Sequence, residues 1–113
     1  MNYIEELGEK AKIASRELLK IGTKTKNDVL LAIADELINK KEEIKAANKI
    51  DLEKGEKNGI SFALLDRMTL TDSRIEGMAQ SLREMAVFPD PIGEVVTGWN
   101  HKNGMNIAKK RVP

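Results

Sequence analysis

The sequence predicts a mainly α-helical fold that ends in a β-hairpin. Through the first 88 residues, apolar side chains recur every three or four positions, which is the period of a helix with one buried face. Pro89-Asp90-Pro91 then interrupts helical structure, because proline lacks a backbone N–H and restricts the residue before it. Beyond this break, Asn103-Gly104 lies between two strand-like runs and is a strong hairpin signal.

The composition indicates a single soluble domain without a polyanionic partner. A chain of 113 residues is long enough for one domain. Its 19 basic and 18 acidic side chains nearly cancel, so no net field would attract nucleic acid or an anionic membrane. No apolar run approaches the ~18 residues of a membrane-spanning helix, and the N-terminus lacks the features of a signal peptide. The absence of cysteine fits a reducing compartment, and we expect a cytoplasmic protein.

The first helix is predicted over residues 3–21. Its apolar residues recur at alternating spacings of three and four: Ile4, Leu7, Ala11, Ala14 and Leu18. Asn2, followed three residues later by Glu5, has the pattern of a capping box, in which each side chain accepts from the other residue's backbone N–H. Gly22 follows the last apolar residues and marks the end of the helix.

Two further helices are predicted over residues 25–40 and 42–57. Thr25 and Asp28 open the earlier one, because a hydroxyl and a carboxylate suit the free amides at the positive end of a helix. Its apolar face is formed by Val29, Leu30, Ile33 and Leu37. The later helix carries more charge and fewer apolar residues, ends at Asn58-Gly59, and is expected to be largely exposed.

The last two helices are predicted over residues 61–68 and 72–87. Ser61 caps the short one, and Thr71 with Asp72 opens the long one. The apolar stripe of the long helix is formed by Ile75, Met78, Ala79, Leu82, Met85 and Ala86. We expect the methionines at helical spacing to fill the core: Met68, Met78 and Met85.

The predicted hairpin has strands over residues 94–100 and 104–112. Asn103-Gly104 favours a type I′ turn, which needs a positive φ at both central residues. This turn sets the expected cross-strand partners, which are Asn100 with Ile107, Trp99 with Ala108, Thr97 with Lys110, and Val95 with Val112. The apolar residues on these strands imply that the hairpin packs on another surface.

The search for a catalytic or metal centre finds no constellation of suitable side chains. His101, the single histidine, lies at the hairpin turn and could carry a proton, but no nucleophile or orienting group is near it in sequence. One imidazole without a thiolate gives no metal-ligand spacing. Glycines 93, 98 and 104 do not form a phosphate-binding loop. We therefore predict no catalytic, cofactor-binding or metal-binding residue in this chain.

Three polar groups have a structural interpretation that we prefer to a functional one. Asn48 and Asp51 share one helix face, where they could meet or grip a neighbouring loop. Asp66 and Arg67 could anchor an ion pair at the end of the short helix. The basic run at residues 109–111, Lys109-Lys110-Arg111, would keep a sheet edge soluble, since a nucleic-acid site would need more basic residues and interleaved aromatics.

Five segments, in order along the chain, resemble one protein family: KAKIASRELLKIGTKTKNDVLLAIADEL, IKAANKIDLEKGEKNGIS, ALLDRMTLTDSRIEGMAQSLREMA, PDPIGEV and GWNHKNGMNIAKKRVP. They are similar to the N-terminal part of γ-glutamyl phosphate reductase, also called glutamate-5-semialdehyde dehydrogenase, of the aldehyde dehydrogenase superfamily. The resemblance implies the N-terminal part of an α/β fold, with residues 1–88 as a helical segment of the cofactor-binding domain and residues 89–113 as a hairpin of the oligomerisation arm.

The resemblance also implies an activity for the full-length enzyme. Such enzymes reduce L-glutamyl 5-phosphate with NADPH to glutamate 5-semialdehyde and phosphate, in proline biosynthesis, and a cysteine attacks the acyl phosphate. No catalytic residue of the family can be assigned to a position here, because the chain has no cysteine. We therefore expect this chain to be a fragment, inactive alone, which associates with the rest of the reductase chain and in a homo-oligomer.

Two other functions remain as alternatives. A stand-alone helical interaction module would bind partner helices through its apolar stripes. A nucleic-acid-binding protein is disfavoured by the balanced charge, and salt-dependent binding to a duplex would support it. The native gene beyond Pro113 separates the reductase from the module, because the reductase requires an apolar strand and then an active-site cysteine.

Overall fold

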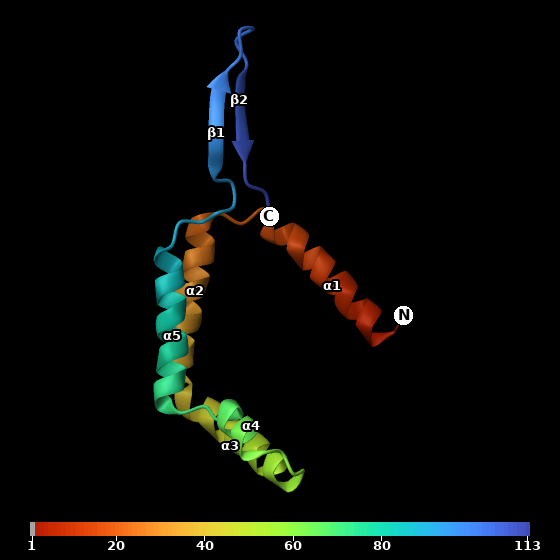
Figure 1. Ribbon diagram of the computed structural model, residues 1–113, viewed down its shortest axis with the longest axis vertical. Coiled ribbons are helices and arrows are strands. Elements are labelled where there is room, and N and C mark those ends of the chain that lie inside the picture. The colour runs from red at the N-terminus through yellow and green to blue at the C-terminus, as the bar shows by residue number, and fades with distance from the viewer. Residues whose placement is uncertain (1) are drawn as a thin grey trace. The chain divides into compact units, whose positions relative to one another are not determined.

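The computed structural model describes residues 2–113, and these residues form helices followed by a two-stranded hairpin (Figure 1). The elements are α1 (Tyr3–Leu18), α2 (Thr23–Asn39), α3 (Lys41–Lys57), α4 (Phe62–Met68), α5 (Asp72–Val87), β1 (Val95–Asn100) and β2 (Asn106–Lys110). The predicted mainly α fold with a C-terminal hairpin is confirmed. Contacts divide the chain into two compact units, of which one is Lys26–Val87 and the other joins the segment up to Thr25 with Phe88–Pro113.

In the unit Lys26–Val87, α2 and α5 lie side by side and run in opposite directions (Figure 1). The buried apolar residues among those described are Ala34 on α2 and Ile75 and Ala79 on α5. An ion pair between Asp35 and Arg83, 3.5 Å apart, joins the same two helices on their exposed side. The fully buried apolar core of this unit is therefore small.

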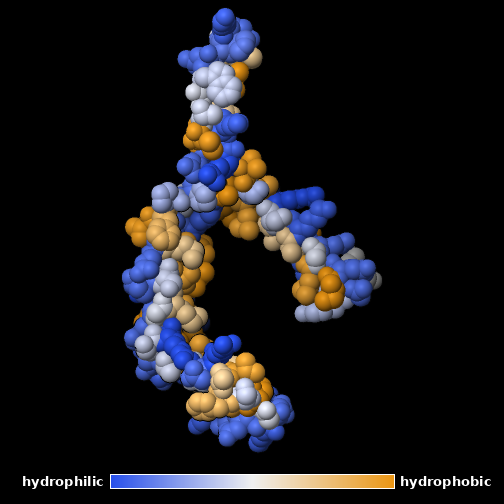
Figure 2. All heavy atoms as spheres, viewed as in Figure 1, coloured by the Kyte–Doolittle hydropathy of each residue, from blue (hydrophilic) through white to orange (hydrophobic). Residues whose placement is uncertain are grey.

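Most apolar side chains of the unit Lys26–Val87 remain open to solvent, and Figure 2 shows hydrophobic surface along its helices. The predicted core methionines are among them, because Met68, Met78 and Met85 are 36%, 45% and 50% exposed. That prediction is wrong for this chain. Two adjacent helices can bury only the residues at their mutual contact, and no third layer covers the outward-facing stripe within the described residues.

α3 and α4 pack closely because the chain places a glycine where they meet. Gly55 is buried, and a Cβ at this position would lie 3.1 Å from both Ile60 Cδ1 and Leu65 Cδ2. The helix ends a turn later, where Gly59 adopts a φ of 75° and its N–H donates to Glu56 O at 3.1 Å. Ile60 N–H donates to Gly55 O at 3.0 Å, which completes a Schellman motif and confirms the predicted stop.

The beginning of α1 agrees with the prediction, and its end does not. Asn2 Oδ1 accepts from Glu5 N at 2.9 Å, and Glu5 Oε2 accepts from Asn2 N at 3.0 Å, so the capping box is confirmed. α1 ends at Leu18, three residues before the predicted end. The following turn tightens, with Lys20 N–H donating to Glu17 O and Ile21 N–H donating to Leu18 O, so apolar periodicity continues after the α-helical geometry has ended.

α2 begins at Thr23, earlier than the predicted start at Thr25. The first residue of this helix contacts a residue 67 positions away, because the Asp90 carboxylate accepts a hydrogen bond from the Thr23 hydroxyl at 2.8 Å. Asp90 also accepts from Ile92 N at 2.9 Å, so one carboxylate joins the start of α2 to the segment before the hairpin. A contact at this sequence separation has no local signal. The boundaries predicted for α3, α4 and α5 are each within one residue of those observed.

The hairpin forms as predicted, but both strands are shorter than predicted. Its register differs from the prediction by one residue at Thr97, Trp99 and Asn100, and by two residues at Val95. The observed partners are Val95 with Lys110, Thr97 with Lys109, Gly98 with Ala108, Trp99 with Ile107, and Asn100 with Asn106. Among the described residues, a positive φ occurs only at glycines, so Asn103 does not have the positive φ that a type I′ turn requires. In this turn only Gly104, with a φ of 91°, adopts the left-handed conformation. Gly104 N–H donates to His101 O at 2.9 Å and His101 N–H to Met105 O at 2.7 Å. The loop therefore has three residues, and this changes every predicted pair.

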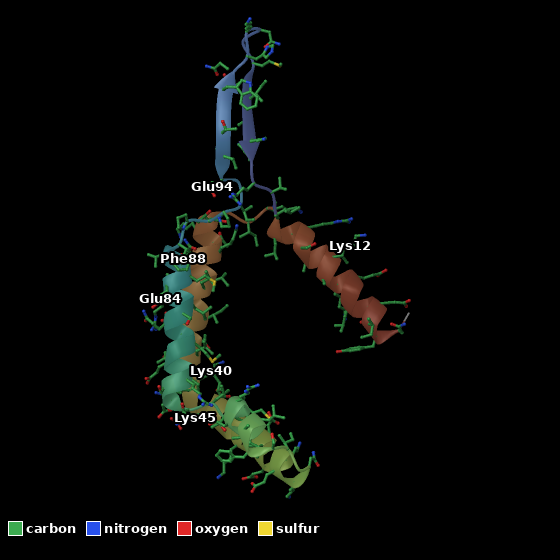
Figure 3. All side chains as sticks on the ribbon, in the orientation of Figure 1. Lys12, Lys40, Lys45, Glu84, Phe88 and Glu94 are labelled. Atoms are coloured by element: carbon green, nitrogen blue, oxygen red, sulfur yellow. The ribbon has the colours of Figure 1, made fainter. Side chains whose placement is uncertain are left out.

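The hairpin exposes both of its faces in the described chain. Every β1 residue is exposed, and in β2 only Ile107 is half-buried. Glu94, labelled in Figure 3, forms an ion pair with Arg111 at 3.3 Å beside the base of the strands. The ladder is also irregular between Val95 and Thr97, where the strand carries an extra residue. The packing of the hairpin on another surface therefore stays a prediction.

Candidate docking surface

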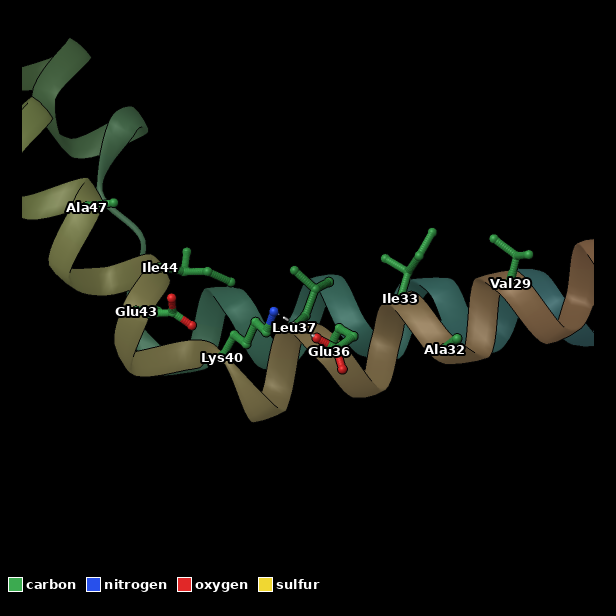
Figure 4. Close-up of a pocket in the computed structure, with 9 residues that line it drawn as sticks. All are labelled: Val29, Ala32, Ile33, Glu36, Leu37, Lys40, Glu43, Ile44 and Ala47. Carbon is green, nitrogen blue, oxygen red and sulfur yellow. Dashed lines mark ion pairs between the residues drawn. The ribbon is translucent and has the colours of Figure 1, made fainter. Parts of the chain in front are cut away.

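An apolar groove extends along α2 and the first turns of α3 (Figure 4). Its volume is about 630 Å³, and it is lined by Val29, Ala32, Ile33, Glu36, Leu37, Lys40, Glu43, Ile44 and Ala47. Figure 4 shows that Val29, Ile33, Leu37 and Ile44 project to the same side. The helical repeat produces this arrangement, because residues three, four and seven positions apart share one face.

Two of the three charged residues that line the groove, Glu36 and Lys40, form an ion pair. Lys40 Nζ lies 3.4 Å from Glu36 Oε2, one helical turn away, and both side chains are exposed. Glu43 lies on the next turn. Within residues 2–113 no group of three or more acidic, histidine or cysteine side chains could hold a metal ion. The groove is therefore suited to contact with apolar protein surface.

A cluster of ion pairs beside the groove ties the start of α3 to the start of α5. Lys45 Nζ lies 2.7 Å from Asp72 Oδ1 and 2.9 Å from Glu42 Oε1, and Lys41 Nζ lies 3.2 Å from Glu76 Oε1. The hydrogen bond to Asp72, followed by that to Glu42, raises the pKa of the Lys45 ammonium above its ordinary value. The same hydrogen bond from Lys45 lowers the pKa of Asp72 below its ordinary value, although partial desolvation of the carboxylate acts in the opposite direction. Both shifts favour the charged pair.

The structure places Asn48 in a tertiary hydrogen-bond pair, as the structural interpretation of this residue predicts. Its Nδ2 donates to Met68 O at 2.8 Å, and its Oδ1 accepts from Leu70 N at 2.9 Å. Both polar ends of the amide therefore hold the segment that connects α4 to α5. Asp51, the neighbour with which Asn48 was paired in the sequence, is exposed and does not contribute to this contact.

Asp66 forms an ion pair, but with Arg74 of α5 and not with its sequence neighbour Arg67. Arg74 Nη2 lies 3.4 Å from the Asp66 carboxylate, and Arg74 Nη1 donates to the backbone oxygens of Asp66 and Thr69, the latter at 2.7 Å. The guanidinium therefore satisfies carbonyls at the C-terminal end of α4. Arg74 lies in the first turn of α5, and no local pattern in the sequence links it to the end of α4.

His101 and the basic run of the hairpin carry no constellation for catalysis. His101 Nδ1 accepts from Asn103 N at 3.4 Å, and the side chain is exposed in the loop. Lys109 and Lys110 lie on β2 opposite Thr97 and Val95, and all are exposed. No helix among the described residues is long and apolar enough to cross a membrane.

Comparison with curated proteins gives matches over the whole chain. The γ-glutamyl phosphate reductase of Campylobacter curvus is 50% identical over 113 residues, which are 100% of this chain and 26% of that protein. The enzyme of the same name from Syntrophomonas wolfei is 52% identical over 108 residues, 96% of this chain and 26% of that protein. No protein-family model matches the chain. The chain thus spans about a quarter of the length of these curated relatives.

Solved structures give the same result for the fold. The crystal structure of γ-glutamyl phosphate reductase from Thermotoga maritima matches with a TM-score of 0.90 and 35% identity, over 99% of this chain and 27% of that one. The enzyme from Saccharomyces cerevisiae matches with a TM-score of 0.84 and 28% identity, over 96% of this chain and 28% of that one.

The described elements define a helical segment with an antiparallel hairpin and open apolar faces, and the solved structures contain this segment within reductases. The chain matches the N-terminal segment of γ-glutamyl phosphate reductases, which confirms the resemblance found in its sequence.

Proposed function

We propose that this chain is the N-terminal quarter of a γ-glutamyl phosphate reductase. The complete enzyme would reduce L-glutamyl 5-phosphate with NADPH to glutamate 5-semialdehyde and phosphate, a step of proline biosynthesis in the cytoplasm. The observation that supports this proposal is identity of 50% along all 113 residues to a reductase of which they represent 26%. The alignment covers the helices and the hairpin alike.

The residues that perform the chemistry lie, in this proposal, in the remaining three quarters of the enzyme. The family's mechanism uses a cysteine that attacks the acyl phosphate, and NADPH supplies a hydride when bound. This chain contains no cysteine, and the contribution we propose for it is structural. Its helices would hold their own positions through Asn48 and Arg74 and present the apolar groove to the rest of the enzyme.

The exposed side chains of α2 and α5 support this role. Ile33 in the groove and Met78 on α5 are 44% and 45% exposed, although burial of such a side chain is worth ~1.5–3 kcal/mol. Covering these side chains with the cofactor-binding core would recover that free energy. Residues 1–88 would then be the helical part of the cofactor-binding domain. Residues 89–113 would be the hairpin of an oligomerisation arm, since both hairpin faces are open here.

The protein encoded by the complete native gene tests the proposal. We expect NADP-dependent and phosphate-dependent oxidation of glutamate 5-semialdehyde, which is the reverse of the reductive reaction and is readily followed by NADPH absorbance. Replacing the cysteine expected beyond Pro113 by serine should abolish it. A folded protein that binds neither NADPH nor the semialdehyde would contradict the proposal and favour the stand-alone interaction module.

A further inference from the structure

The two Asn-Gly pairs of the chain have different local structures. Asn-Gly is the dipeptide most prone to deamidation, because glycine leaves its backbone nitrogen unhindered for attack on the side-chain amide. Asn58-Gly59 ends α3, and Asn103-Gly104 lies in the three-residue hairpin loop. We propose that Asn103 is a site of spontaneous deamidation, converting to aspartate and isoaspartate, and that the fold protects Asn58.

The hairpin loop already holds the donor that this reaction needs. Met105 N–H donates to Asn103 Oδ1 at 3.1 Å. When a nucleophile adds to Cγ, negative charge develops on that oxygen, and a positioned N–H stabilises it in the manner of an oxyanion hole. The same hydrogen bond polarises the amide before attack. The hairpin loop itself therefore makes the Asn103 Cγ more susceptible to nucleophilic attack.

The nucleophile at this site, the backbone nitrogen of Gly104, makes one hydrogen bond and lies in an exposed turn. Gly104 N–H donates to His101 O at 2.9 Å, and every residue from His101 to Met105 is exposed. Rotation of the Asn103–Gly104 peptide breaks this bond, and water can satisfy the freed groups. Opening of such a loop requires no apolar surface to separate, so its free energy is low.

The backbone after Asn58 is more strongly restrained than the backbone after Asn103. Gly59 N–H donates to Glu56 O at 3.1 Å, and Ile60 N–H donates to Gly55 O at 3.0 Å within the same motif. Ile60 is half-buried against the contact between α3 and α4, where Gly55 is fully packed. Release of the Gly59 nitrogen therefore requires the end of α3 to unravel and this packing to separate.

The reaction at Asn103 balances without any co-reactant except water. The Gly104 nitrogen forms a bond to Cγ, the bond from Cγ to Nδ2 breaks, and the Gly104 amide proton leaves with that nitrogen as ammonia. Water then opens the cyclic imide at either carbonyl, giving aspartate or isoaspartate. Each product adds one negative charge. Isoaspartate also inserts a methylene into the main chain of the three-residue loop that joins the strands in which Trp99 lies opposite Ile107.

The test compares the folded chain with the same chain in urea, at mildly alkaline pH and body temperature. Peptide mass mapping and methyl labelling of isoaspartate follow each site, and the variants Asn103→Gln and Asn58→Gln assign the signals. In urea both sites should convert at similar rates. In the folded chain, Asn103 should convert at least about tenfold faster than Asn58, equivalent to a difference of ~1.4 kcal/mol in barrier. Equal rates, faster conversion at Asn58, or no conversion at Asn103 would each overturn the proposal.

Discussion

The side-chain amide of Asn48 in α3 donates to the backbone carbonyl of Met68 at the end of α4, with an N···O distance of 2.8 Å. Because the same amide also accepts from Leu70 N at 2.9 Å, it satisfies two backbone groups of a segment that has no regular structure. This relationship positions the start of α5, which provides Asp72 to the neighbouring ion pairs. The helical unit therefore depends on one polar side chain as well as on its small core.

Replacing Asn48 by alanine should destabilise the helical unit. The part-buried Leu70 N–H would lose its acceptor, and a loss of this kind costs about 1–3 kcal/mol. Urea unfolding followed by circular dichroism measures the change. Asp51→Ala, one turn further along the same helix face, should change the unfolding free energy by less than about 0.5 kcal/mol. Equal effects of the two substitutions would contradict the role assigned to Asn48.

The ion pair between Lys45 and Asp72 should contribute to stability only at intermediate pH. The folded pKa of Asp72 lies below its ordinary value of 3.8, so the contribution is present above that value and is lost as the pH falls through the folded pKa. The folded pKa of Lys45 lies above 10.5, so its contribution is present below 10.5 and is lost as the pH rises through the folded value.

A double-mutant cycle with Lys45→Met and Asp72→Asn measures this coupling directly. The coupling free energy should be favourable at neutral pH and vanish in strong acid, where the carboxylate is protonated. High salt should reduce it at neutral pH, because both side chains remain partly exposed. A coupling that is unchanged in acid would show that packing, not charge, joins α3 to α5 here.

Replacing Gly104 by valine should weaken the hairpin and leave the helices folded. Its φ of 91° is accessible to glycine, whereas a β-branched residue in this conformation would be strained by ~1–3 kcal/mol. Amide hydrogen exchange should lose protection in β1 and β2 and keep it in α2 and α5. Gly98→Ala is the matched control, since φ is not positive there and a Cβ would lie 3.5 Å from Ile107 O. Unchanged protection in the Gly104→Val strands would contradict the observed loop.

Sequence periodicity could predict the elements because each depends on neighbours within a turn or two. The capping box at Asn2 and the stop at Gly59 are local hydrogen-bond patterns, and both were predicted. The predicted start of α2 was two residues late, and the contact of its first residue, Thr23, with Asp90 is 67 positions distant and has no local signal. The hairpin register was wrong because Asn-Gly fits both a two-residue loop and a three-residue loop, and only the φ of Asn103 distinguishes them.

Less of the candidate docking surface could be predicted. The stripe containing Val29, Ile33 and Leu37 was recognised, but periodicity does not show what covers it. The methionines were assigned to a core because their spacing is helical, whereas within this chain they face outward. Arg74 was missed because its contacts are to backbone oxygens of another helix.

The isolated chain should self-associate at micromolar concentration. Val29 and Ile33 in the groove are 51% and 44% exposed, and contiguous apolar surface of this kind is uncommon on soluble monomers. The groove variant Ile33→Glu should shift the sedimentation equilibrium toward monomer. Lys49→Gln, which changes the net charge equally at an exposed position outside the groove, should not. A wild-type chain that is a compact monomer without dye-binding apolar surface would support the stand-alone module.

In the proposed enzyme, these 113 residues serve as the N-terminal quarter of a γ-glutamyl phosphate reductase. The most direct test is a chimaera in which they replace the matching quarter of the Campylobacter curvus enzyme, with NADPH-linked turnover measured against that enzyme. We predict that the kcat/KM of the chimaera is within about tenfold of that of the parent enzyme, a factor that corresponds to ~1.4 kcal/mol of transition-state stabilisation. The 113-residue chain alone should show no turnover. A chimaera that folds and assembles like the parent but has no activity would contradict the account.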